Sequence, residues 1–156
     1  MPTTLWPHSP IPETPGSAWE WQVATPGQLC RLRADLRARF RDAAPPDEAP
    51  DQDECDHLVL AVDELATNGL RHGLEPVVTR IVLTARGWLI DIADGLTECG
   101  PEPAHGRDPA LGGMGLHLVA ELTTRRGWSV TGGRKHVWAC LPFGVCAGTG
   151  PGQSSF

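Results

Sequence analysis

The chain contains 156 residues, of which 40% are hydrophobic, and its formal net charge is −6. This length fits one domain with a sizeable core, because domains usually hold about 100–200 residues. The acidic balance argues against direct nucleic-acid binding, which requires a basic surface. No apolar run approaches the roughly 18 residues of a membrane span, and the N-terminus lacks a signal-peptide pattern. We therefore expect a soluble cytoplasmic protein that does not bind a membrane.

The five cysteines are scattered along the chain, and they form no C-x-x-C pair and no metal-ligand spacing with a histidine. We interpret Cys30 and Cys140 as buried small apolar residues rather than redox or metal-binding groups.

The first elements in chain order are a tail, a strand and a helix. Residues 1–17 hold five prolines and little apolar material, which predicts a disordered tail. Residues 18–23 alternate between aromatic or apolar and polar side chains, which is typical of a half-buried strand. Thr25, Pro26 and Gln28 then form the capping box and first turn of a helix. The apolar face of this helix contains Leu29, Leu32, Leu36 and Phe40.

The opposite face of that helix is basic. Its five arginines are Arg31, Arg33, Arg37, Arg39 and Arg41. Two interpretations stay open: a solvated surface, or a docking surface for an acidic partner. An acidic, proline-containing loop over 42–53 follows.

A second helix is expected to begin at Asp51-x-x-Glu54 and to end at Gly73. Its polar face carries Glu64 and Asn68, which are neighbours because they are four residues apart. A carboxylate beside a carboxamide can hold a hard cation or orient a hydroxyl, or it can simply be a solvated polar surface.

The second half of the chain predicts strands in pairs. Residues 77–86 and 88–93 are β-branched runs that form a hairpin, and residues 95–113 form a long loop. A helix follows Gly115, and a last hairpin turns at Gly132-Gly133. Residues 144–156 are expected to be a flexible Gly-rich tail. This order predicts an α+β fold, with an antiparallel or mixed sheet and helices on one face.

Two later features bear on function. Glycines before a helix let a phosphate approach backbone N–H groups, and Gly113 and Gly115 occupy such a position. This is neither a dinucleotide fingerprint, because Leu118 replaces the third glycine, nor a Walker loop, because no Gly-Lys-Ser/Thr exists. Asp94 at a strand end could accept a hydrogen bond from an exocyclic amine, or could be an ordinary turn residue.

The combination of Glu64-x-x-x-Asn68, Asp94 and Gly113-x-Gly115-Leu116 resembles the N, G1 and G2 boxes of the GHKL ATPase superfamily. The finer resemblance, over residues 18–143, is to the bacterial anti-sigma-factor serine kinases and stand-alone histidine-kinase-like ATPases. It implies a two-layer α/β sandwich of the GHKL (Bergerat) type, with a mixed, mostly antiparallel sheet.

The resemblance also implies roles for individual residues. Glu64 would be the general base and Asn68 the Mg²⁺ ligand, Asp94 would bind the adenine amine, and 95–112 would be the lid. The cofactors would be ATP and Mg²⁺. The nucleotide-binding residues would be Asn68, His72, Asp94, Gly95, Gly113, Met114, Gly115, Leu116 and His136.

Two positions depart from the family pattern. Leu96 stands where a second glycine is usual, two residues after Asp94. His136 stands where the family has a threonine whose hydroxyl supports the adenine-binding aspartate. The imidazole could hydrogen-bond Asp94 in its place, or could fill the adenine pocket.

We therefore expect an ATP-binding serine/threonine kinase of the anti-sigma-factor type, which phosphorylates a small protein antagonist and so regulates transcription. The alternative is a non-catalytic module that sequesters a sigma factor or another partner, with nucleotide structural or absent. Free ATP hydrolysis is a third interpretation. The resemblance leaves a homodimer open.

Overall fold

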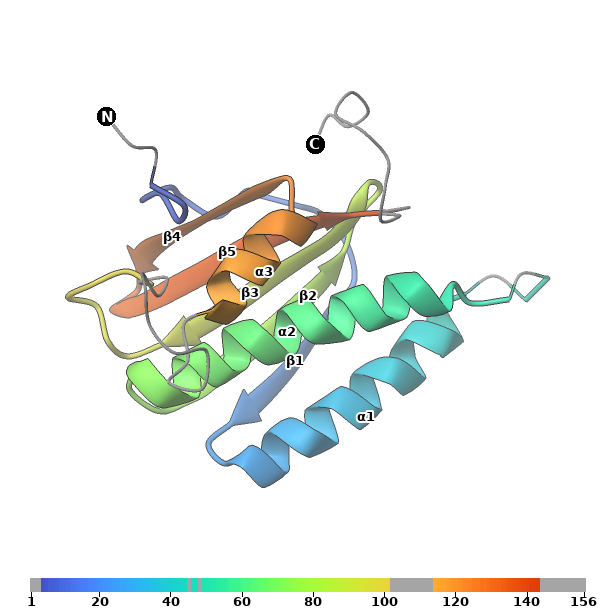
Figure 1. The fold of residues 1–156 in the computed structure, drawn as a ribbon, viewed down its shortest axis with the longest axis horizontal. Helices are drawn as coiled ribbons and strands as arrows, with labels where there is room; N and C mark the ends of the chain where they lie inside the picture. Colours follow the sequence, from blue (N-terminus) through green and yellow to red (C-terminus); the bar gives the residue numbers. More distant parts are fainter. Residues whose placement is uncertain (1–3, 45, 48, 102–113, 144–156) are drawn as a thin grey trace.

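In the computed structural model, residues 4–44, 46–47, 49–101 and 114–143 are described. Within them one five-stranded antiparallel sheet has the order β1-β2-β3-β5-β4. The strands are β1 (Ala18–Val23), β2 (Val77–Leu83), β3 (Gly87–Asp94), β4 (Arg125–Thr131) and β5 (Arg134–Pro142). The helices α1 (Pro26–Ala43), α2 (Gln52–His72) and α3 (Met114–Leu122) lie on one face of this sheet (Figure 1). The predicted α+β fold is confirmed.

The helix ends follow from local sequence chemistry. Thr25 Oγ1 accepts a hydrogen bond from Gln28 N at 3.2 Å, and Gln28 Oε1 accepts one from Thr25 N at 3.1 Å, so the predicted capping box is present. Asp51 caps α2 through Glu54 N at 3.2 Å. At the other end of α2, Gly73 N donates to Gly69 O at 2.9 Å. These boundaries determine which residues of α2 face the sheet and which lie on its polar side.

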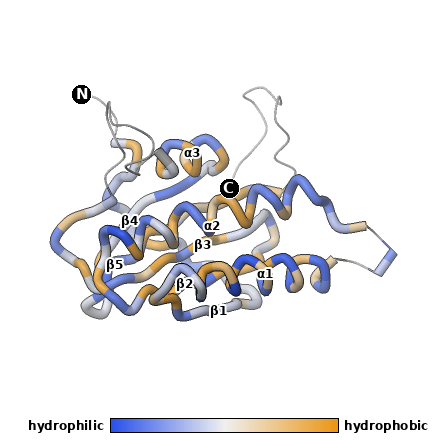
Figure 2. The backbone as a smooth tube through the Cα atoms, turned by 60° about the horizontal axis from the view of Figure 1, so that its bottom comes forward, coloured by the Kyte–Doolittle hydropathy of each residue, from blue (hydrophilic) through white to orange (hydrophobic). Residues whose placement is uncertain are grey.

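The core lies between the helices and the sheet. Polar and apolar residues alternate along α1 and α2 (Figure 2); α1 packs against β1, and α2 packs against β2 and β3. A smaller cluster on the other face of the sheet contains Val82, Leu89, Trp138 and Cys140. The expected burial of Cys140 is confirmed, whereas Cys30 is exposed because it lies outside the apolar stripe of α1.

Both predicted hairpins are present. Residues 84–86 join β2 to β3, and Gly87 N donates to Thr84 Oγ1 at 3.1 Å. Between β4 and β5, Gly132 and Gly133 have φ values of 60° and 75°. Both lie in the left-handed region, which a two-residue type I′ hairpin requires and which glycine adopts at little cost.

The N-terminal segment corrects one expectation. Residues 4–17 are not a disordered tail, because Trp6 is only 1% exposed and Trp138 Nε1 donates to Ser9 O at 2.9 Å. The prolines in this segment prevent a regular strand, but they do not prevent packing against the sheet. The predicted C-terminal tail and most of the predicted lid, 102–112, lie outside the described residues.

None of the helices in the described part of the chain is long and apolar enough to cross a membrane.

Candidate functional site

The polar side of α2 meets the beginning of α3. A small cavity of about 50 Å³ lies between the two helices. The residues that line it are Glu64, Thr67, Asn68, Arg71, His72, Gly115 and Leu116. Five of these residues were expected to form the site, so the structure brings together the two sequence segments that contain them. Thr67 was not singled out, although its position beside Asn68 on the same helix could have indicated it.

Gly115 allows the close contact between the two helices. A Cβ atom at this position would collide with the carboxylate of Glu64, so no other residue fits here without a shift of one helix or of that side chain. The first four N–H groups of a helix have no partner within the helix. The contact therefore holds the N-terminal amides of α3 next to Glu64, where they favour a bound anion.

The environment of Glu64 suits a proton acceptor. Burial raises the pKa of the Glu64 carboxyl, the nearby charge of Asp63 raises it further, and Arg71 opposes the shift. A carboxylate with a raised pKa binds a proton more readily, which is the property a general base needs.

Asp94 lies at the end of β3 and faces the helices, but it is only 1% exposed. Its Oδ1 accepts a hydrogen bond from Leu96 N at 2.7 Å, and its Oδ2 lies 3.6 Å from Lys135 Nζ. A Cβ on Gly73 would lie 2.5 Å from Asp94 Cγ, so the end of α2 packs directly on this carboxylate.

Gly95 N donates to Leu74 O at 2.8 Å, which anchors the chain just after Asp94.

Lys135 is the residue of this region that sequence reasoning did not single out. It is 4% exposed and pairs with Asp94 across the two neighbouring strands β3 and β5. Lys135 is the only lysine in the chain, which could have marked it as a residue with a special role. Its pairing with Asp94 could not be predicted, because it depends on the strand register.

His136 does not contact Asp94, so the first of the two interpretations of this residue is wrong. His136 Nδ1 instead lies 2.9 Å from Asp91 Oδ1, on the sheet face away from the helices. Successive side chains of a strand point to opposite faces, so Lys135 reaches Asp94 while His136 cannot. His136 therefore neither replaces the missing hydroxyl nor fills a pocket beside Asp94.

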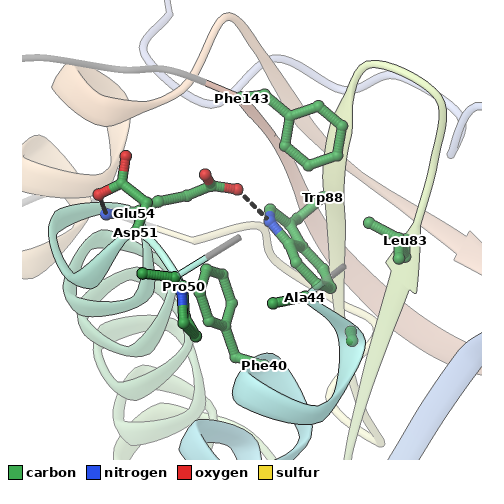
Figure 3. Close-up of a pocket in the computed structure, with 10 residues that line it drawn as sticks. Phe40, Ala44, Pro50, Asp51, Glu54, Leu83, Trp88 and Phe143 are labelled. Atoms are coloured by element: carbon green, nitrogen blue, oxygen red, sulfur yellow. Dashed lines mark hydrogen bonds between the residues drawn. The ribbon is translucent and has the colours of Figure 1, made fainter. Parts of the chain in front are cut away.

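A larger cavity, of about 490 Å³, lies at the opposite end of α2 (Figure 3). Phe40, Trp88 and Phe143 line it, and Trp88 Nε1 donates to Glu54 Oε1 at 3.1 Å. None of the site residues predicted from the sequence lines this cavity. Its size alone does not make it the functional site. Its two carboxylates have structural partners, because Asp51 caps α2 and Glu54 accepts the Trp88 hydrogen bond.

The donors between α2 and α3 fit a magnesium ion and phosphate oxygens. Asn68 offers a carboxamide oxygen, and the start of α3 offers backbone N–H groups. Within the described residues there is no group of three His, Cys, Asp or Glu side chains that would bind a metal by itself. A cavity of about 50 Å³ has room for an ion or water, whereas a whole ligand usually needs roughly 300 Å³ or more. Gly113 lies outside the described residues, and of Met114 only the backbone is described.

Comparison with known protein families shows a match over most of the chain. The family model described as histidine kinase-like ATPase domain matches residues 24–141. The matched range contains all of the predicted site residues, from Glu64 to His136. No curated protein sequence matches the chain.

Proposed function

Because the chain belongs to the histidine kinase-like ATPase family, a nucleotide-binding family, we propose that it binds Mg-ATP and phosphorylates a serine or threonine of a small regulatory protein. The observation that carries this proposal is the position of Glu64 and Asn68 on α2, directly against Gly115 at the start of α3.

Asn68 and the start of α3 would hold the phosphate end of the nucleotide. The carboxamide oxygen of Asn68 is a suitable Mg²⁺ ligand, and the amides at Gly115 and Leu116 suit phosphate oxygens. Bound magnesium would neutralise charge on the phosphates. Asp94 would accept a hydrogen bond from the adenine amine. The adenine and Lys135 would then share this carboxylate.

Glu64 would act on the protein substrate. Its carboxylate accepts the proton of the serine or threonine hydroxyl, whose oxygen forms a bond to the γ-phosphorus while the bond to ADP breaks. The raised pKa of Glu64 supports this assignment because it favours proton transfer to the carboxylate. The products are ADP and the phosphorylated protein, and phosphoryl transfer of this kind depends mainly on positioning and charge neutralisation.

One observation favours a second candidate function. Asp94 is almost fully buried against Gly73 and Lys135, so the adenine ring must displace part of this packing to reach the carboxylate. In the second candidate the same domain sequesters a sigma factor or another regulatory protein without turnover.

The experiment that tests the kinase proposal is transfer of labelled phosphate from ATP to a candidate antagonist by wild type and by Glu64→Gln. Glu64→Gln should still bind ATP but transfer phosphate about 10²–10⁴-fold more slowly, because the amide cannot accept the proton. Glu121→Gln, a change at an exposed carboxylate on α3, is the matched control and should behave as wild type. Normal transfer by Glu64→Gln would refute the role of Glu64, and a partner bound without any transfer by wild type would favour the second candidate.

A further inference from the structure

The N-terminal segment 4–9, which precedes the range matched by the family model, lies along the outer edge of β4 (Figure 1). Ser9 N donates to Trp128 O at 2.8 Å, and Trp128 N donates to Pro7 O at 3.0 Å. The ring of His8 also meets the ring of Trp128 edge to face, with centroids 4.6 Å apart. These contacts extend the sheet beyond its last strand and fix the course of the segment.

From this edge the segment reaches α3. Trp6 is 1% exposed and belongs to the same apolar cluster as Leu116 and Val119 of α3. Its Nε1 donates to Leu116 O at 3.4 Å. Trp6 therefore contacts the helix within two residues of Gly115, the residue that packs on Glu64.

A second connection runs through Arg126. Arg126 Nε donates to Leu5 O at 2.9 Å, and its Nη1 donates to Ala120 O at 3.3 Å. Ala120 O is one of the last four carbonyls of α3, which have no partner within the helix. The same guanidinium thus joins the N-terminal segment to the C-terminal end of α3.

These contacts are important because α3 is short. A helix of nine residues has little stability of its own, so its position depends on what packs against it. Besides α2, the packing partners of α3 include Trp6, and Arg126 links it to Leu5. Loss of the N-terminal contacts would remove one of these supports, and the amides of α3 would then be held less firmly relative to Glu64 and Asn68.

We propose that the N-terminal segment 4–9 is a working part of the nucleotide site, and that Trp6 is a positioning residue that holds the phosphate-binding end of α3 against α2. The part that concerns nucleotide rests on the function proposed above. Trp6 acts through α3 and touches neither Glu64 nor the phosphates.

The test uses the full-length chain and two measurements on wild type, Trp6→Ala, Trp6→Phe and Trp21→Ala. Hydrogen exchange of the α3 amides, compared with the β3 amides, reports the position of α3 without any nucleotide. Titration with Mg-ATP reports the site. Trp21→Ala is the matched control because it also removes a hydrogen-bonded tryptophan, whose Nε1 donates to Asp35 of α1 at 2.7 Å.

In Trp6→Ala we expect α3 exchange to accelerate and ATP affinity to fall, each by about tenfold or more, within the usual range of coupling between sites. Trp6→Phe, which retains an apolar ring, should recover most of both losses, and Trp21→Ala should leave both properties near wild type. If Trp6→Ala does not fold, Gly127→Ala replaces it. A Cβ on Gly127 would lie 2.9 Å from Pro7 O, 3.0 Å from Ser9 Cβ and 3.0 Å from Trp138 Cζ2, so this variant crowds the segment and the Trp138 ring beneath it but keeps Trp6.

Unchanged α3 exchange in Trp6→Ala and Gly127→Ala would overturn the inference, and so would faster exchange with unchanged ATP affinity. A wild-type protein that binds no ATP refutes the proposed function and the nucleotide part of this inference together. The exchange measurement then still decides whether the segment holds α3.

Discussion

At the scale of single residues, the contact between His136 and Asp91 predicts a pH-dependent stability. The hydrogen bond to Asp91 raises the pKa of His136, while burial and the charges of Arg134 and Arg80 oppose this shift. A histidine whose pKa is raised by folding stabilises the protein fully below its unfolded pKa of about 6.5. This stabilisation is lost as the pH rises through the raised folded pKa.

The measurement is the free energy of unfolding of wild type and His136→Thr as a function of pH. Wild type should be more stable by about 1 kcal/mol below pH ~6, since a hydrogen bond between charged groups contributes roughly this much or more. The advantage should shrink above the raised folded pKa. Asp91→Asn is the control, because it removes the charge that raises the pKa of His136, and it should abolish the pH dependence that His136 contributes to the free energy of unfolding. A difference in this free energy between wild type and His136→Thr that is constant with pH would contradict the assignment.

Single residues also show which contacts could be predicted from the sequence and which could not. Glu64 and Asn68 were identified as neighbours because helical periodicity places residues four apart side by side. The partners of Asp94 depend instead on the register between β3 and β5, which the sequence leaves open. A shift of one position exchanges Lys135 for His136 and moves the side chain to the other face of the sheet. The interpretation of His136 as a partner of Asp94 came from the family resemblance, which does not fix this register.

At the scale of elements, the contact between α2 and α3 gives a prediction at Gly115. An alanine here places a methyl group on the Glu64 carboxylate and must move that side chain or the start of α3. We expect Gly115→Ala to lower phosphate transfer by tenfold or more, roughly the loss of one well-placed catalytic interaction. Its free energy of unfolding should change by only about 1 kcal/mol, because alanine favours the helix.

Gly27→Ala is the matched control, since Gly27 is likewise the second residue of its helix, α1. There a Cβ meets only Thr25 Oγ1, at 3.8 Å, which is ordinary contact. Both variants gain helix propensity, but only Gly115→Ala should lose activity. Equal activity in the two variants would contradict the close packing of α3 on Glu64.

The elements differ in how far the sequence predicts them. The starts of α1 and α2 follow from Thr25, Gln28 and Asp51, because capping is a local interaction. The order of the strands along the chain and both hairpins were also predictable from turn residues and alternation, whereas the order of the strands in the sheet was not predicted. The position of Trp6 was not, because the segment around it has no periodicity and its packing on α3 joins residues 110 positions apart.

At the scale of the whole molecule, the helices and the sheet form one two-layer domain (Figure 1), and the candidate site lies between α2 and α3, with Asp94 at the end of the central strand β3. The central claim is that Asn68 and the start of α3 make this domain a Mg-ATP-binding protein. Asn68 lies on the polar side of α2, so its replacement should leave the apolar core unchanged. The variant Asn68→Ala can therefore separate a loss of ATP binding from a loss of folding.

The most direct test is calorimetric titration of ATP, with and without Mg²⁺, into wild type, Asn68→Ala and the control Gln52→Ala, which removes an amide at the other end of α2. Wild type and Gln52→Ala should bind ATP more tightly with Mg²⁺. Asn68→Ala should remain folded and should lose the gain in affinity that Mg²⁺ provides. We expect this loss to be tenfold or greater, which corresponds to about 1.4 kcal/mol or more. Absence of ATP binding by wild type, or an Mg²⁺ effect that persists unchanged in Asn68→Ala, would contradict the account.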